Sequence, residues 1–212
     1  MRSNVFWMGA ALAAGAGATA ATVVFDVNTN SGSDPMLYSV SVHDNAPGLL
    51  TFALTVAASS ANNGDVAALY LNFNAANAAA GYSALDFFGD AITGVAFNTS
   101  NVQAGSIGQP FQFGLAIGNT GSGSDFYDSF SFTMNLKNGL TLNDLALLGV
   151  RAQSVGPGSS FGNPAGGSSK TFIERGEPTP EPNPIPVPLP TGAGLAGLGL
   201  LIAGARRRRA AF

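Results

Sequence analysis

The chain has 212 residues, a length that fits one sizeable domain or two small ones. Hydrophobic residues make up 46% of it but charged residues only 10%, less than half the roughly 25% of an ordinary soluble domain. This composition excludes a coiled coil or helical bundle, which needs Glu and Lys on its solvent face, and the patterned apolar runs exclude charge-driven disorder. The absence of cysteine excludes disulfides and thiolate metal sites, and the single histidine, His43, excludes a histidine-rich metal cluster.

The formal net charge of −3 conceals an uneven distribution of charge. Five of the nine basic residues are Arg2 and the block Arg206, Arg207, Arg208 and Arg209. The segment between these ends holds four basic residues and all 12 acidic ones, a net charge of −8. A body this acidic repels phosphate backbones, so nucleic acid is excluded as a partner.

The first 20 residues have the pattern of an export signal. Arg2 precedes an apolar run from Val5 to Leu12, and the segment ends in the small residues Ala18-Thr19-Ala20 that a signal peptidase accepts. The alternatives are a buried first helix or a membrane anchor, but the apolar run is shorter than the roughly 20 residues that a span needs. We therefore expect a signal peptide over residues 1–20, cleaved between Ala20 and Ala21.

Residues 21–176 carry the alternation of apolar and polar residues that marks half-buried strands. The pattern predicts an all-β domain of eight or nine strands, packed as an antiparallel, jelly-roll-like sandwich of two sheets. The predicted strands are 23–27, 38–42, 50–56, 69–74, 92–97, 111–117, 129–136, 148–152 and 171–173.

Turn chemistry separates these strands, and two segments favour a short helical turn. Turns are predicted at Asn45–Gly48, Asn62–Asp65 and Gly118–Asp125. The helical turns are expected within Ala75–Ala80 and Leu140–Leu147. The polar faces of the strands carry Ser, Thr, Asn and Gly in place of Lys and Glu, which suits a protein that is diluted outside the cell or associates with itself there.

Two acidic segments resemble parts of calcium loops. Asp26–Asn30 places oxygen ligands at positions 1, 3 and 5, but position 12 of such a loop is Leu37 instead of a bidentate acid, so a turn after the first strand is the better interpretation. Thr120–Tyr127 approximates one copy of a glycine-rich calcium repeat that works only in tandem, so a hairpin loop is preferred. Asp125 and Asp128 remain weak calcium candidates, and we expect no cofactor.

Catalytic groups are scarce in the sequence. His43 shares strand parity with Ser39 and Ser41, which places it on a polar face, and a Ser-His-Asp triad would depend on it alone. Glycoside hydrolysis needs two acids roughly 5–10 Å apart. Asp86 with Asp90, or Asp125 with Asp128, are only sequence neighbours, so no enzyme is expected.

Exposed aromatic rings would favour carbohydrate binding. Trp7 lies in the predicted signal, which leaves four tyrosines. Tyr70 is the best single candidate because it falls on the polar side of its strand. Core or edge packing is nevertheless the commoner role for all four tyrosines, Tyr38, Tyr70, Tyr82 and Tyr127.

The C-terminal part begins with a change of composition near Gly176. Residues 177–190 contain seven prolines in 14 residues, which predicts an extended polyproline spacer. Thr191 can cap a helix over Gly192–Ala205, whose 14 residues span about 21 Å at 1.5 Å each, short of a roughly 30 Å hydrocarbon core. The four arginines that follow act as a membrane stop on the cytoplasmic side. An ordinary permanent anchor is the alternative.

The order of spacer, Val187-Pro188-Leu189-Pro190, short helix and arginine block resembles the PEP-CTERM class of bacterial sorting signals, in particular its VPLPA-CTERM variant. Thr191 stands where the variant usually has alanine. The resemblance, confined to residues 191–212 and the few before them, implies a transient inner-membrane anchor that an exosortase-type membrane protease cuts at Val187–Thr191. It also implies release to the cell surface or the extracellular matrix of an exopolysaccharide producer.

Three functions remain open for the β-domain. The leading hypothesis is a secreted, non-catalytic protein of the cell surface or extracellular matrix. The alternative is a carbohydrate-binding module acting on exopolysaccharide, and the third is a secreted hydrolase.

Overall fold

The computed structural model describes residues 21–103, 106–119 and 125–175 and forms an antiparallel all-β domain. The predicted all-β class is confirmed, with ten strands instead of eight or nine. Apart from the strands, the described residues form two single-turn 3₁₀ helices, η1 (Ala84–Asp86) and η2 (Leu142–Asp144). The strands are β1 (Ala21–Asn30), β2 (Tyr38–Ala46), β3 (Leu49–Val56), β4 (Asn63–Phe73), β5 (Phe87–Phe88), β6 (Ile92–Asn101), β7 (Ser106–Ile117), β8 (Ser129–Asn135), β9 (Leu145–Gly156) and β10 (Gly167–Arg175).

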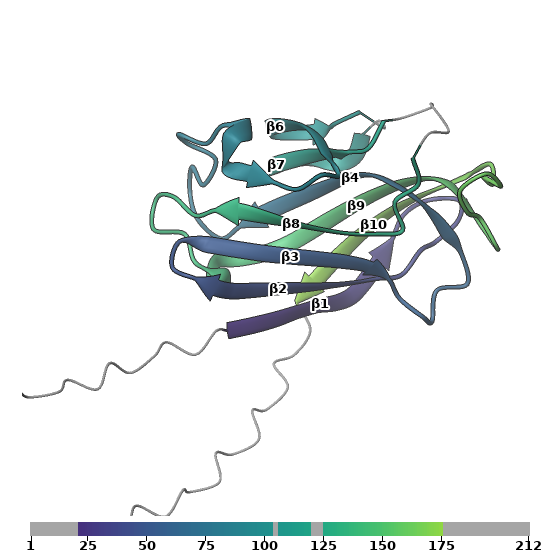
Figure 1. The fold of residues 1–212 in the computed structure, drawn as a ribbon, viewed down its shortest axis with the longest axis horizontal. Coiled ribbons are helices and arrows are strands. Elements are labelled where there is room, and N and C mark those ends of the chain that lie inside the picture. The colour runs from purple at the N-terminus through teal and green to yellow at the C-terminus, as the bar shows by residue number, and fades with distance from the viewer. Residues whose placement is uncertain (1–20, 104–105, 120–124, 176–212) are drawn as a thin grey trace, which may run out of the picture. The chain divides into compact units, whose positions relative to one another are not determined.

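All ten strands belong to one sheet, in the order β5-β8-β3-β2-β1-β10-β9-β4-β7-β6. The sequence suggested two separate sheets, but the pairing of β1 with β10 joins the two halves. Figure 1 shows β8, β3 and β2 as one layer and β4, β9 and β10 as a second layer that crosses it. The sheet therefore curls until its halves face each other, in a nearly barrel-shaped arrangement.

The main core fills the space between these halves, and Phe113 of β7 lies near its centre. Its ring centroid is 4.9 Å from that of Tyr82, 5.7 Å from those of Phe73 and Phe87, and 6.0 Å from that of Phe97. These contacts connect β7 with β4, β5 and β6. The two edges of the sheet, β5 and β6, are thus held by side-chain packing on one shared ring.

A second apolar cluster, here called the outer cluster, lies on the opposite face of β4. It comprises Ala68, Tyr70, Val102, Ile107, Phe111 and Ala116. Tyr70 alternates with Leu69 and Leu71 of the main core, so its side chain points away from that core, yet its exposed fraction is 0%. The end of β6 and the start of β7 cover it, and the Val102 N–H donates a hydrogen bond to the Tyr70 hydroxyl at 3.0 Å. The expectation that Tyr70 lies on a polar face is wrong, because both faces of β4 are buried, and the preferred role of core packing is the one that Tyr70 has.

The Asp26–Asn30 segment is the second half of β1, so the predicted turn there is wrong. The Asn28 side chain explains why this polar sequence remains extended. Its amide oxygen accepts from the Tyr38 N–H and its amide nitrogen donates to the Tyr38 carbonyl, both at 2.9 Å. The β1–β2 backbone pairing runs from Ala21 to Phe25, so Asn28 continues the connection by side chain. A carboxamide carries both the donor and the acceptor that a strand backbone would supply.

Two further local predictions differ from the structure. Asn63–Asp65, predicted as the end of a turn, opens β4, where it pairs with the end of β9. Residues 76–81 form hydrogen-bonded turns, and the nearby 3₁₀ helix begins only at Ala84. The second predicted helical turn is confirmed by η2, which lies within 140–147.

β6 forms one edge of the sheet and carries no charged residue. Its pairing with β7 shifts register between Ile92 and Gly94 and again between Thr99 and Asn101. Asn98, between these shifts, has a φ of 50°, in the left-handed region.

The predicted signal peptide, proline-rich spacer and sorting tail lie outside the described residues. Within the part of the chain that the structure does describe, no helix is long and apolar enough to cross a membrane.

The buried Tyr70 hydroxyl gives a first prediction. Tyr70→Phe removes the acceptor of the buried Val102 N–H, so we expect the free energy of unfolding to fall by about 1–2 kcal/mol. Urea denaturation of residues 21–176 expressed alone measures this change. Wild-type stability in the variant would contradict the role given to this hydrogen bond.

Candidate functional site

A hollow of about 330 Å³ opens at one end of the sheet, where three segments far apart in the sequence meet. It is lined by residues of β4 and β9, by Asn119, Asp125 and Phe126 from the described parts of the β7–β8 connection, and by the β9–β10 loop. The lining residues are Asp65, Asn119, Asp125, Phe126, Gln153, Ser154, Ser160, Phe161, Gly162 and Pro164. In Figure 1 the β9–β10 loop lies at the right, far from the start of β1.

Asp125 is held in the hollow by the chain turn at the end of β7. Its Oδ2 accepts a hydrogen bond from the Asn119 N–H at 2.7 Å. Gly118 precedes this amide with a φ of 59°, and a Cβ there would come within 2.6 Å of Asp125 Oδ2. The close approach and the left-handed backbone both require glycine.

Asp65 faces the same hollow from the start of β4. Its Oδ1 accepts from the Tyr127 N–H at 2.9 Å, and the Val66 N–H donates to the Tyr127 carbonyl at 2.8 Å. These bonds fasten the β7–β8 connection to β4. Burial raises the pKa of the Asp65 carboxyl, hydrogen bonds from Tyr127 and Gln153 lower it, and the nearby negative charge of Asp125 raises it further. The sequence did not single out Asp65, because Asn62–Asp65 had the composition of a turn.

The β9–β10 loop is braced from inside by Ser159, which is buried. The Ser159 hydroxyl donates to the Ser154 carbonyl and accepts from the Ala165 N–H. Ser160 and Asn163 exchange backbone hydrogen bonds across the loop tip. The braced tip presents Phe161, whose exposed fraction of 64% is high for so large an apolar side chain.

The two weak calcium candidates have different environments. Asp125 lines the hollow, whereas Asp128 does not and instead contacts Asn63 Nδ2 at 3.4 Å and the Ser129 hydroxyl at 3.3 Å. Across residues 21–103, 106–119 and 125–175, no three acidic, histidine or cysteine side chains gather where they could hold a metal ion.

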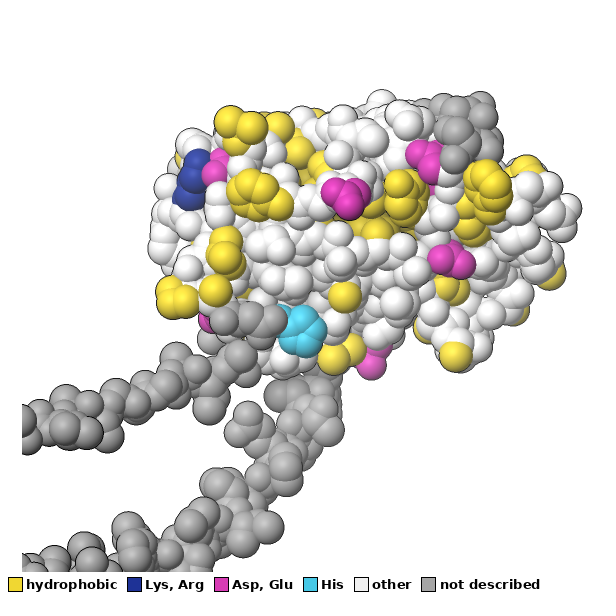
Figure 2. Space-filling model, in the orientation of Figure 1, with side chains coloured by type: hydrophobic (Ala, Val, Ile, Leu, Met, Phe, Trp, Pro, Cys, Tyr) yellow, Lys and Arg dark blue, Asp and Glu magenta, His cyan; other side chains and the backbone are white. Residues whose placement is uncertain are grey.

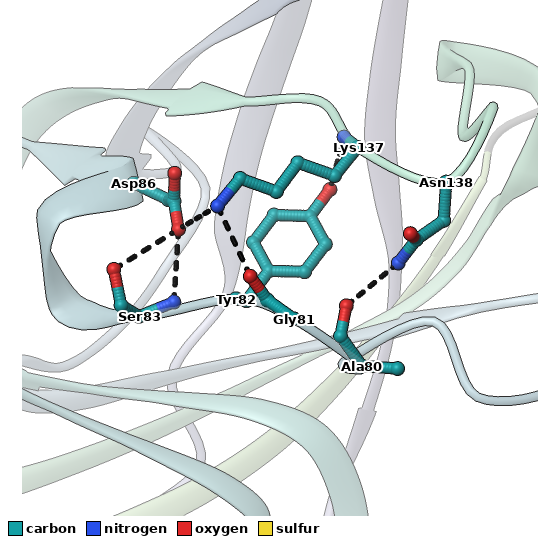
Figure 3. A network of polar contacts seen from close by, with 7 residues as sticks. All are labelled: Ala80, Gly81, Tyr82, Ser83, Asp86, Lys137 and Asn138. Carbon is teal, nitrogen blue, oxygen red and sulfur yellow. Dashed lines mark hydrogen bonds and ion pairs between the residues drawn. The ribbon is translucent and has the colours of Figure 1, made fainter.

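Asp86 and Asp90, considered as a catalytic pair, are not equivalent. Asp86 is 5% exposed and pairs with Lys137 Nζ at 2.7 Å, whereas Asp90 is exposed. Figure 3 shows that Lys137 also reaches the Gly81 carbonyl and that its N–H donates to the Tyr82 hydroxyl. The network joins the segment before β5 to the one after β8, a structural role.

The pKa of Asp86 is about 2, below its ordinary value of 3.8. The hydrogen bond from Lys137 is the largest cause, followed by the bond from the Ser83 N–H. Both favour the ionised carboxylate.

The remaining candidates lie as follows. His43 is on the polar face of β2, as predicted, and its Nδ1 is 2.8 Å from the Thr22 hydroxyl. Tyr38 and Tyr82 are buried, and Tyr127 is half-buried. The tyrosines therefore supply no well-exposed ring. Two phenylalanines of the described residues are exposed, Phe88 of β5 (49%) and Phe161 (64%), and strand parity could not reveal Phe161 because it lies in a loop.

The face of the molecule in Figure 2 is mostly polar and uncharged, with scattered acidic side chains. Comparisons with protein-family models, curated protein sequences and solved structures find no match.

The Asp86–Lys137 pair gives a pH-dependent prediction. Because folding lowers the pKa of Asp86, its contribution to stability is present above the unfolded pKa near 3.9 and is lost as the pH falls towards 2. Asp86→Asn should lower the free energy of unfolding by about 1–2 kcal/mol at pH 7, since Lys137 is partly exposed, and should lower it less at pH 2.

Urea denaturation between pH 7 and pH 2 measures this difference. Asp90→Asn, at an exposed position outside the network, is the matched control. Equal pH profiles for wild type and Asp86→Asn would contradict the assigned role.

Proposed function

We propose that this chain is a secreted, non-catalytic protein of the cell surface or extracellular matrix, sorted by its C-terminal signal. The observation that carries the proposal is the placing of the chain ends relative to the hollow. Arg175, the last described residue, pairs with Phe25 near the start of β1. The loop that lines the hollow precedes the other end of β10. This strand is nine residues long, so its two ends are eight steps, or about 26 Å at roughly 3.3 Å per residue, apart.

This arrangement suits a tethered protein. Arg175 lies at the end of β10 opposite the hollow, so a tether attached there is joined to the domain away from the hollow. The polar, weakly charged faces of the strands also suit a matrix component. We further propose to group the curled sheet with jelly-roll-like sandwiches, because its two halves pack face to face on one core.

The sorting proposal rests on the physical chemistry of the tail. The sequence predicts a helix over Gly192–Ala205 that is short and rich in glycine, which would let it unwind at the outer interface. The predicted polyproline spacer would present Val187–Thr191 there in an extended form. Moving the four arginines across the membrane is costly, so they remain in the cytoplasm. The partners proposed here are signal peptidase and an exosortase-type protease.

The carbohydrate-binding alternative gains support from the hollow, where an exposed ring stands beside carboxylates and amides. A secreted hydrolase remains the third candidate. Asp65 and Asp125 give it a pair of acids in one hollow, which the sequence pairs Asp86/Asp90 and Asp125/Asp128 did not. Release of reducing sugars from a polysaccharide by the wild type, lost in Asp65→Asn, would favour the hydrolase over both other functions.

Processing of the tail gives a third prediction. We expect intact-mass analysis of surface-extracted protein to find a chain that begins at Ala21 and ends near Pro190. Replacing all four residues of Arg206–Arg209 with serine should abolish this species, because the membrane stop is lost. Replacing Lys170 and Arg175, two basic residues of β10, with serine is the matched control and should leave processing unchanged.

A mature chain that still carries Arg206–Arg209 would show that the tail is a permanent anchor. That result would overturn the sorting proposal.

A further inference from the structure

We propose that the hollow between β4, β9 and the β9–β10 loop is a saccharide-binding site that selects neutral or amino sugars over uronic acids. The sugar ring stacks on Phe161. Asp65 and Asp125 accept hydrogen bonds from its hydroxyl or ammonium groups, and the Gln153 amide can donate or accept. This inference deepens the carbohydrate-binding alternative and rests on it.

The aromatic side of the hollow has the form of a stacking platform. Phe161 exposes 64% of its surface at the tip of a loop that Ser159 braces from within. Pro164 lies in the same wall, and Phe126 is half-buried on the opposite one. A large, exposed apolar side chain on a braced loop indicates a contact surface, and the C–H face of a sugar ring is an apolar partner of matching size.

The polar side of the hollow is fixed in position before any ligand arrives. One oxygen of each carboxylate accepts a hydrogen bond from a backbone N–H group. The Tyr127 N–H donates to Asp65 Oδ1, and the Asn119 N–H donates to Asp125 Oδ2. Gln153 adds a side-chain hydrogen bond to Asp65. Carboxylates accept strong, charge-assisted hydrogen bonds from hydroxyl groups, and groups already fixed lose little entropy on binding.

The sign of the charge supplies the specificity. The described lining contains two carboxylates and no lysine, arginine or histidine. A uronic acid would bring a third negative charge into a partly desolvated hollow, whereas the ammonium group of an amino sugar would be attracted. Neutral hexoses are accepted through their hydroxyl groups alone.

The size of the hollow limits the ligand. Its volume of about 330 Å³ is near the lower end of the roughly 300–1,000 Å³ typical of small-molecule sites. We therefore expect it to hold one or two sugar rings of a longer polymer.

The test uses the full-length chain in a polyoxyethylene detergent, which contains no sugar. Calorimetric titration with tetrasaccharides of glucose, glucosamine and guluronic acid should give binding to at least one of the first two, at least tenfold tighter than to the uronic acid. Phe161→Ala should weaken that binding at least tenfold. Leu85→Ala removes another exposed apolar side chain, 81% exposed and outside the lining of the hollow, and should leave binding unchanged.

A second pair of variants tests the charge of the Asp125 carboxylate. Asp125→Asn removes a negative charge inside the hollow and should reduce the ratio of the affinity for the neutral or amino sugar to the affinity for the uronic acid. Asp128→Asn, at a residue outside the lining, should leave this ratio unchanged. Melting curves of all four variants establish that each is folded.

Two results would overturn the inference. Saccharide binding that survives Phe161→Ala would place the carbohydrate site elsewhere and leave the carbohydrate-binding function standing. No binding of any of the three sugars would refute the site, while the processed mass of the mature chain would still support a sorted surface protein.

Discussion

The pairing of β1 with β10 is the constraint on which the rest of the structure depends. It turns two groups of strands into one curled sheet and brings the described ends of the chain together. Because β10 then runs the length of the domain, the loop before it lies at the far end, where it can meet the connection between β7 and β8. The hollow is therefore a consequence of topology, and its lining residues lie almost 100 positions apart in the sequence.

Side-chain amides complete the sheet where the backbone ladders stop. Asn28 does so between β1 and β2, and Gln112 between β7 and β4, where it accepts from the Phe73 N–H at 2.7 Å and donates to the Ala75 carbonyl at 3.0 Å. A chain poor in charge can thus satisfy its buried backbone groups with Asn and Gln side chains, without lysine or glutamate. The side-chain amide of Asn28, acting in place of a backbone peptide group, also explains how the polar segment after Phe25 stays in a strand.

The alternation of apolar residues was sufficient to locate nine strands, because most of them have one face in the core and one towards solvent. It failed for Tyr70, whose strand is covered on both faces, and for β5, whose two residues are too few to show a period. The site was harder to predict. No local sequence pattern marks Asp65 or Phe161 as a site residue. They line one hollow only because the fold brings the start of β4 next to the distant β9–β10 loop. Only Asp125 was singled out beforehand, and for a different ligand.

The uncharged edge strand β6 has a consequence for contacts between copies of the chain. Stacking of identical chains into cross-β fibrils requires a flat, regular segment of about six or seven residues. The register shifts at both ends of β6 and the left-handed backbone at Asn98 break it into shorter pieces. The irregular geometry of β6 therefore has the effect that lysine residues have at the edges of other sheets, and it makes β6 a poor template for pairing with a second copy of the chain.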